Sequence, residues 1–148
     1  MLIDVATAAD IPALSKLLSE LFSQEAEFTP NPEAQARGLA RIISDPHIGT
    51  ILVARDGNGV IGMVNLLFTI STALGEKVAL LEDMVVSSRV RRSGIGSQLL
   101  VRAIAYARAQ RCRRITLLTD RANKSAQEFY ARQGFAPSIM IPMRLHLE

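Results

Sequence analysis

The sequence predicts an α/β protein with a mixed, mostly antiparallel sheet flanked by helices. The chain has 148 residues, 49% of them apolar and 21% charged, which suits a single domain over residues 1–148 with its own core. Segments with helical periodicity alternate with short β-branched runs. Three of these runs are joined by short connections, which favour antiparallel neighbours, whereas a long helix joins the next two in parallel.

The first strand and the first two helices are predicted from apolar spacing and end signals. Residues 1–6 are expected to form a strand. Asp10 is a preferred N-cap residue, and a helix should follow it through Phe22 because leucines recur there at helical spacing. Prolines and polar residues predict a loop over 23–32, and a second helix is expected over 33–44.

Three antiparallel strands are expected next, over 50–55, 60–70 and 77–86. The run Asp56–Gly59 (DGNG) joins the first two and is a strong signal for a hairpin turn. Residues 71–76 should turn the chain into the third of these strands.

Helix and strand alternate in the remainder. A helix is expected over 94–110, a β-branched strand over 114–119, and a helix over 123–133 that ends at Gly134. These elements form the parallel part of the predicted sheet.

A last strand is predicted over 139–147, where every second residue is apolar. Pro142 lacks an N–H group, so this strand should lie at an edge of the sheet or contain a bulge. An edge strand can pair with its mate across a two-fold axis, and we therefore expect a homodimer.

Charge is distributed unevenly along the chain. Residues 1–88 carry 5 Lys and Arg against 11 Asp and Glu, a balance of −6, whereas residues 89–148 carry 12 against 3, a balance of +9. An acidic half indicates a cationic partner and a basic half an anionic one. Nucleic acid is such an anion, but the chain has no Trp and only 5% aromatic residues, so platforms for base stacking are scarce.

Composition argues against several classes of protein. No apolar run reaches 18 residues and the first residues lack a basic region, so neither a transmembrane helix nor a signal peptide is expected. Cys112 is the only cysteine, and His47 and His146 are the only histidines, which argues against a disulfide or a metal site. We therefore expect a cytoplasmic protein without a metal ion.

The turn between the fourth strand and the next helix has the composition of an anion-binding site. It contains Arg91-x-x-Gly94-x-Gly96. Amides at a helix N-terminus are unpaired, and glycine lets a bulky anion approach the backbone, so the turn suits a phosphate or pyrophosphate. It is neither a Walker P-loop nor a dinucleotide fingerprint, because GK[ST] is absent and Leu99 replaces the third glycine. The glycine pattern alone also fits an ordinary strand–helix turn.

Two motifs resemble those of the GNAT superfamily of acyl-CoA N-acyltransferases. Arg91, Gly94 and Gly96 match the [Q/R]-x-x-G-x-[G/A] pattern that follows the fourth strand in that family. In addition to the two motifs, the short run LEDMVV over 81–86 is similar to the LEDxxV run of polyamine and thialysine acetyltransferases. The family pattern N-x-x-A-x-x-F-Y-x-x-x-G-F, expected after the next strand, is matched by Asn123, Ala126, Phe129, Tyr130, Gly134 and Phe135.

The resemblance implies that the chain binds acetyl-CoA. The fourth and fifth strands would splay apart, so that the pantetheine arm pairs with the main chain at Met84 and Val86. Asn123 would hydrogen-bond this arm. Backbone amides of the turn would hold the pyrophosphate, namely those of Arg91, Arg92, Ser93, Gly94, Ile95, Gly96 and Ser97.

The resemblance also implies how an amine would be acetylated. Tyr130 would protonate the departing thiolate, although simple packing within an amphipathic helix also explains this residue. An alkylammonium has a pKa of about 10.4, so a carboxylate should relay its proton away. Glu82 and Asp83 are the candidates. Alternation selects Glu82, which shares a face with Val86, and a β-bulge would reverse the choice.

Two further expectations concern the environment of the reaction. A backbone N–H near Val85 or Val86 would bind the oxyanion. The basic half should lower the pKa of the Tyr130 phenol, which at about 10 is a weaker acid than a thiol at about 8.5.

The expected function is therefore transfer of acetyl from acetyl-CoA to the primary amine of a small cationic molecule, by direct attack in a ternary complex. One alternative is an acetyltransferase that acts on a protein N-terminus or lysine. A second is a non-catalytic acyl-CoA-binding regulatory module. A third is a nucleic-acid-binding domain that uses the arginine-rich half.

Overall fold

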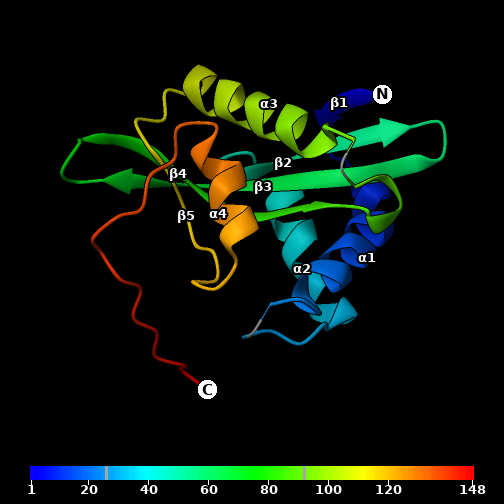
Figure 1. Ribbon diagram of the computed structural model, residues 1–148, viewed down its shortest axis with the longest axis horizontal. Helices are drawn as coiled ribbons and strands as arrows, with labels where there is room; N and C mark the ends of the chain where they lie inside the picture. The colour runs from blue at the N-terminus through cyan, green and yellow to red at the C-terminus, as the bar shows by residue number, and fades with distance from the viewer. Residues whose placement is uncertain (26, 92) are drawn as a thin grey trace.

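The computed structural model describes residues 1–25, 27–91 and 93–148 and has a five-stranded sheet at its centre, in the order β1-β2-β3-β4-β5 (Figure 1). Strands β1 to β4 pair antiparallel in chain order, and β5 lies parallel to β4. The predicted fold class is thus confirmed. The strands are β1 (Leu2–Val5), β2 (Gly49–Asp56), β3 (Gly59–Ser71), β4 (Glu76–Val86) and β5 (Ile115–Leu117).

The elements predicted as far as residue 133 are all present, within about two residues of their expected ends. Among the described residues, none of the helices combines the length and the apolarity that a membrane span requires. The helices are α1 (Ile11–Phe22), α2 (Pro32–Ile43), α3 (Ile95–Ala109) and α4 (Lys124–Ala131), with two short 3-10 helices, η1 (Ala8–Asp10) and η2 (Ser88–Val90).

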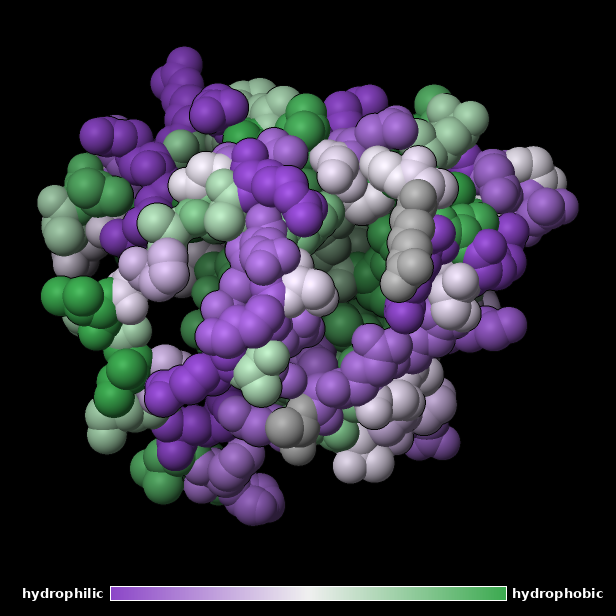
Figure 2. Space-filling model, in the orientation of Figure 1, coloured by the Kyte–Doolittle hydropathy of each residue, from purple (hydrophilic) through white to green (hydrophobic). Residues whose placement is uncertain are grey.

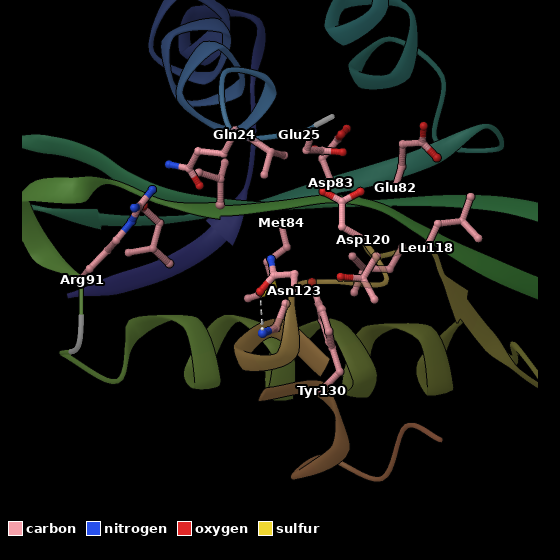
Figure 3. Close-up of a pocket in the computed structure, with 16 residues that line it drawn as sticks. Gln24, Glu25, Glu82, Asp83, Met84, Arg91, Leu118, Asp120, Asn123 and Tyr130 are labelled. Atoms are coloured by element: carbon pink, nitrogen blue, oxygen red, sulfur yellow. Dashed lines mark hydrogen bonds between the residues drawn. The ribbon is translucent and has the colours of Figure 1, made fainter. Parts of the chain in front are cut away.

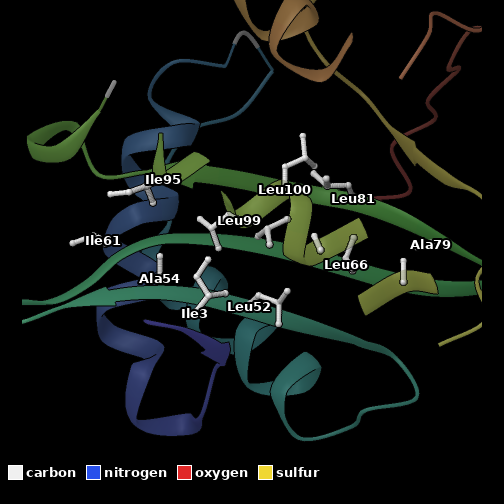
Figure 4. Packing of buried hydrophobic residues seen from close by; sticks show 13 residues of the cluster. Ile3, Leu52, Ala54, Ile61, Leu66, Ala79, Leu81, Ile95, Leu99 and Leu100 are labelled. Atoms are coloured by element: carbon white, nitrogen blue, oxygen red, sulfur yellow. The ribbon is translucent and has the colours of Figure 1, made fainter. Parts of the chain in front are cut away.

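The sheet separates two hydrophobic cores. Helices α1 and α2 cover one face, where Leu14 and Met63 are fully buried. Helix α3 covers the other face, where Leu66 and Leu99 are fully buried (Figure 4). Helix α4 packs against this second core through Phe129. Each strand therefore needs apolar residues on both faces, which explains why the central strands are almost continuously apolar.

A β-bulge interrupts β4 at Glu82. Asn65 of β3 pairs with Asp83, but the next residue of β3 pairs with Leu81, so Glu82 is an extra residue in β4. The bulge changes which way the following side chains point. Leu81 packs in the core under α3, whereas Val85, four residues later, packs in the core under α1. Strict alternation would have put both on one face.

Strands β4 and β5 pair over a short distance and then separate. The last pair joins Leu81 to Leu117, and β4 continues beyond it to Val86. The fifth strand is only three residues long. The sheet is thus splayed between its fourth and fifth strands, as expected.

The strand predicted over 139–147 is wrong. This tail has no strand, and its apolar side chains are exposed, with Ile139 at 99% and Met143 at 91%. The tail runs away from the sheet in Figure 1, and Figure 2 shows hydrophobic surface on that side of the molecule. A strand needs a hydrogen-bonded neighbour, so alternation alone does not produce one. Instead Arg144 pairs with Glu27 in the loop after α1.

Asp10 precedes α1 as predicted, but its carboxylate binds Arg55 instead of capping the helix. The Arg55 guanidinium donates to both Asp10 oxygens at 2.6 and 2.7 Å, and the Thr7 amide donates at 2.8 Å. Hydrogen bonding to Arg55 is the main reason that the pKa of Asp10 is lowered to about 2. Arg55 also donates to Asp4 at 2.9 Å, so one guanidinium joins β1, η1 and β2.

We expect Asp10→Asn to lower the free energy of unfolding by about 2 kcal/mol at pH 7. The pKa of Asp10 is 3.8 in its ordinary state and about 2 in the folded chain. The ionised carboxylate therefore stabilises the fold fully when the pH is above 3.8, and this stabilisation is lost as the pH falls towards about 2. Urea denaturation at pH 7 and at pH 3 measures the change.

Asp4→Asn is the matched control for this prediction. The Asp4 side chain is 45% exposed, so removing its charge should cost less than about 1 kcal/mol. An equal loss of stability in both variants, or a loss at pH 7 that persists unchanged at low pH, would contradict the role given to Asp10.

Candidate active site

A pocket lies where β4 and β5 separate (Figure 3). The end of α1 and the loop after it form one side, β4 crosses the middle, and the β5–α4 loop with α4 forms the other side. Segments that are far apart in the sequence therefore meet in one cavity. The predicted site residues that line it are Glu82, Asp83, Met84, Val85, Val86, Arg91, Asn123 and Tyr130.

Sequence reasoning missed the other half of the lining. Glu25 and Gln24 come from the loop after α1, and Asp120 comes from the loop after β5. Nothing in the local sequence marks Gln24 or Glu25, because only the fold brings their loop to β4. The sequence favours Asp120 as a cap of the next helix over a ribose contact, but the residue that caps α4 is Asn123. The residues missed are Leu21, Gln24, Glu25, Leu81, Leu118, Thr119, Asp120 and Ala126.

Four carboxyl groups line this pocket, those of Glu25, Glu82, Asp83 and Asp120. Burial is the main cause that raises the pKa of Glu25, and repulsion from the other three carboxylates raises it further. Like charges held this close repel one another unless a cation lies among them. The pocket is therefore suited to a positively charged molecule.

Asp83 is the most deeply buried of these carboxyl groups. Only 9% of the residue is exposed, and the Nδ2 group of Asn65 donates a hydrogen bond to its Oδ2 at 3.0 Å. Burial raises the pKa of Asp83 to about 6, against the opposing effect of the Asn65 hydrogen bond and with a further rise from Glu82. Asp83 is thus mostly ionised at pH 7 and more basic than an ordinary aspartate.

The bulge in β4 removes the reason for preferring Glu82 over Asp83. The preference assumed strict alternation along the strand, and the register shift at Glu82 interrupts it. Glu82 is exposed, whereas Asp83 is buried and faces α1 together with Val85. The condition under which the choice would reverse is therefore met, and the geometry favours Asp83.

Tyr130 both packs in the core and borders the pocket. Its ring makes edge contacts with Phe129 and Phe135, at centroid distances of 5.2 and 5.7 Å. Burial raises the pKa of Tyr130 to about 12, and the negative charges of Glu25 and Asp83 add to the rise. The expectation that the basic half lowers this pKa is wrong, because burial is the main influence on the phenol and the charges that act on it are those of carboxylates.

The predicted anion-binding turn follows β4, and of its described residues Arg91 lines the pocket while those from Ser93 to Ser97 lie outside the lining. Gly94 has a φ of +83°, a conformation that favours glycine, and helix α3 starts directly after it. A Cβ at Gly96 would lie 3.4 Å from the Phe129 ring, an ordinary van der Waals contact, so the start of α3 and helix α4 are close neighbours here. The other predicted amides in the turn are those of Ser93, Ile95 and Ser97, while Arg92 lies outside the described residues.

Two predicted cofactor ligands already have partners within the chain. Arg91 donates from Nε to the Val86 carbonyl at 3.1 Å, and its Nη2 lies 3.9 Å from a carboxylate oxygen of Glu20. Asn123 accepts the Ala126 amide at 3.1 Å and so caps α4 (Figure 3). Any bond from Asn123 to a ligand would therefore come from its Nδ2 group.

We expect Asp83→Asn to raise the free energy of unfolding at pH 8 by about 1–3 kcal/mol. The pKa of Asp83 is raised from 3.8 to about 6, so between these values the folded chain holds a proton that the unfolded chain has lost. Stability therefore falls as the pH rises through this range, and asparagine removes the penalty. Thermal denaturation at pH 4 and pH 8 tests this.

Glu82→Gln is the matched control, because Glu82 is the neighbouring carboxylate but is exposed. It should change stability by less than about 0.5 kcal/mol at either pH. A loss of stability of Asp83→Asn at pH 8 would contradict the penalty ascribed to the buried charge.

Comparison with known proteins places these features in a family. The model of the acetyltransferase (GNAT) family matches residues 11–135. The aminoalkylphosphonate N-acetyltransferase of Salmonella typhimurium is 29% identical over 133 residues, 90% of this chain and 83% of that protein. YhfO of Bacillus subtilis, an uncharacterized N-acetyltransferase, is 30% identical over 122 residues, 80% of each chain.

The fold is shared with solved structures as well. The crystal structure of a transcriptional regulator from Bacillus halodurans has a TM-score of 0.82 and 27% identity, with 99% of each chain covered. The family match includes both sequence motifs and the lining of the pocket on either side of β4. The chain therefore belongs to the GNAT family of acetyltransferases.

Proposed function

We propose that this acetyltransferase transfers acetyl from acetyl-CoA to the primary amine of a small cationic molecule, by direct attack in a ternary complex. The observation that carries the proposal is the position of Asp83. It is a buried, unusually basic carboxylate in the same pocket as Tyr130. Asp83 belongs to β4 and Tyr130 to α4, and both border the pocket in Figure 3. A base and an acid could therefore act on one reacting centre.

The turn before α3 has the donors that the acetyl-CoA pyrophosphate requires. The first backbone bond of the helix runs from Gln98 to the Gly94 carbonyl, so the amides of Ile95, Gly96 and Ser97 precede it and can face an anion. The open edge of β4 beyond its pairing with β5 leaves main-chain groups for an extended arm. Acetyl-CoA would supply the thioester carbonyl on which the amine acts.

Asp83 would take the proton from the attacking nitrogen. Proton transfer from a free ammonium of pKa about 10.4 to Asp83 at about 6 is uphill by roughly 6 kcal/mol. The nitrogen becomes much more acidic once it has bonded to the carbonyl carbon, so Asp83 accepts the proton most readily at that stage. A backbone N–H near Val85 or Val86 would stabilise the oxyanion.

Tyr130 would donate its proton to the sulfur as the carbon–sulfur bond breaks. A phenol of pKa about 12 is a weaker acid than a thiol of about 8.5, so full transfer to a free thiolate is uphill by about 5 kcal/mol. Donation during bond cleavage, with the hydrogen bond to the developing thiolate, avoids part of this cost. The products are the acetylated amine and CoA. The ammonium loses its first proton to solvent before the attack, and the proton held by Asp83 then returns through solvent to the Tyr130 phenolate, so both side chains regain their starting states.

The four carboxylates favour a cationic acceptor over a neutral or anionic one. The Salmonella relative is named for an aminoalkylphosphonate, and this name supports a small primary amine as the acceptor. An aminoalkylphosphonate differs from the proposed cationic acceptor because it also carries a negatively charged phosphonate. Thiol release from acetyl-CoA with a diamine, 2-aminoethylphosphonate, an aminoglycoside and a lysine peptide separates these possibilities. We expect the highest kcat/KM with the diamine, and a preference for the phosphonate would contradict a cationic acceptor.

A non-catalytic acyl-CoA-binding module is the second candidate, because one similar structure is described as a transcriptional regulator. This candidate predicts that calorimetry detects CoA binding while no amine in the panel gives thiol release. Turnover with any amine in the panel would exclude it.

We expect Asp83→Asn and Tyr130→Phe each to lower kcat by about 10²–10⁴-fold, since both remove a proton-transfer group. Glu82→Gln should lower kcat by less than about tenfold, because Glu82 acts at most through water. Calorimetric CoA affinity should be unchanged in all three variants. Full activity of Asp83→Asn or of Tyr130→Phe would remove the role proposed for that residue.

A homodimer remains our proposal for the assembly, supported by the exposed apolar tail. The side chains at 139, 141, 143, 145 and 147 are all more than 70% exposed, an unusual density of apolar surface for a single chain. A second copy that pairs with this tail would cover them and supply the strand neighbour that the tail lacks.

Removal of residues 139–148 should convert the dimer to a monomer in sedimentation analysis. Arg144→Gln, which changes only a charge in the same segment, is the control and should stay dimeric. A full-length chain that sediments as a monomer would contradict the dimer.

A further inference from the structure

Asn65 is a buried amide whose hydrogen bonding is only half satisfied. It lies in β3 between Val64 and Leu66, is 3% exposed, and pairs with Asp83 beside the bulge. Its Nδ2 donates to Asp83 at 3.0 Å, whereas its Oδ1 is buried and has no hydrogen-bond partner among the described residues. An unpaired buried carbonyl is costly, and an apolar residue would suit this position in the sheet better. A reason for the amide is therefore needed.

The two ends of a carboxamide are nearly the same in shape but opposite in hydrogen bonding. With Asp83 ionised, the NH₂ group of Asn65 faces the carboxylate and donates, as observed. With Asp83 protonated, a half turn of the amide would bring Oδ1 to the carboxylic O–H as an acceptor. A base in proton transfer must pass through both states. The asparagine side chain has a donor for the ionised state and an acceptor for the protonated state.

We propose that Asn65 is a positioning residue for the transferase reaction, which holds the Asp83 carboxyl in the pocket in both protonation states by turning its amide. This inference rests on the proposed role of Asp83 as the base. Within the described residues, Asn65 is the only side chain that donates a hydrogen bond to Asp83.

The other charged and titratable groups of the pocket mostly act against ionisation of Asp83. Glu82 is adjacent in β4, and Glu25, Asp120, Tyr130 and Arg91 reach the pocket from four other segments. The carboxylates repel the charge of Asp83, and of this set only Arg91 is a cation. The hydrogen bond from Asn65 lowers the pKa of Asp83 and so opposes both burial and this repulsion.

Asn65→Leu tests the inference, because leucine has a similar volume and offers no hydrogen bond. The ¹³C titration of the Asp83 carboxyl, identified by its absence in Asp83→Asn, should move upward by about one pH unit, because the hydrogen bond from Asn65 to the ionised carboxylate is stronger than the bond to the protonated acid. The acidic limb of the kcat/KM profile should move by the same amount, so that a shift of one unit lowers activity about fivefold at pH 6 and only slightly at pH 8. Asn65→Ser, which keeps a hydroxyl that can donate a hydrogen bond, should shift the Asp83 titration less than Asn65→Leu does.

Met63→Leu is the matched control, since Met63 is fully buried in the same strand and pairs with Val85. It should leave the titration and the acidic limb in place. An unshifted Asp83 titration in folded Asn65→Leu overturns the inference, as does an equal loss of activity at every pH. Should Asn65→Leu not fold, the same two outcomes apply to Asn65→Ser.

The titration does not depend on turnover, so failure of the inference and failure of the proposed function are distinguishable. An unshifted titration overturns the role of Asn65 alone. Full activity of Asp83→Asn overturns the proposed base and, with it, the catalytic part of this inference.

Discussion

One extra residue in β4 determines what the pocket presents to a ligand. Hydrogen bonding to β3 holds the strand on both sides of Glu82, so the register shift there cannot relax without loss of several backbone bonds. The shift turns Asp83 from the α3 face to the α1 face, where the end of α1 and the loop after it line the pocket. The separation of β4 from β5 then opens the sheet beside it. The functional chemistry is thus a consequence of main-chain pairing as much as of residue type.

The same geometry sets a conflict between stability and activity. A carboxylate as buried as Asp83 is destabilising when ionised, and the surrounding carboxylates increase this cost. Elsewhere the chain does the opposite, since Arg55 neutralises Asp10 with two short hydrogen bonds. The contrast between these two aspartates distinguishes a carboxylate that is paired with a cation and holds the fold together from one that is buried among other carboxylates in the pocket. Uncompensated charge is typical of sites that bind and transform a ligand.

The order of elements, the splayed strands and the two motifs could be predicted from the sequence, because periodicity and turn residues are local signals. The bulge could only be stated as a condition, since it depends on how β3 pairs with β4. Glu25 and Asp120 were missed because loops from distant segments bring them to the pocket. The strand predicted for the tail is wrong for a different reason: its apolar alternation is strong, but among the described residues no strand pairs with it.

The contact between Gly96 and Phe129 has a consequence for ligand selection. The start of α3 lies beside the Phe129 ring of α4, since a Cβ built on Gly96 would be 3.4 Å from that ring, and Tyr130 is the next residue along α4. The spacing between the amides at the helix start and the phenolic oxygen is therefore held by close side-chain packing instead of by a flexible connection. The donor proposed above would reach from one to the other, and its length would have to match this spacing before any bond is broken.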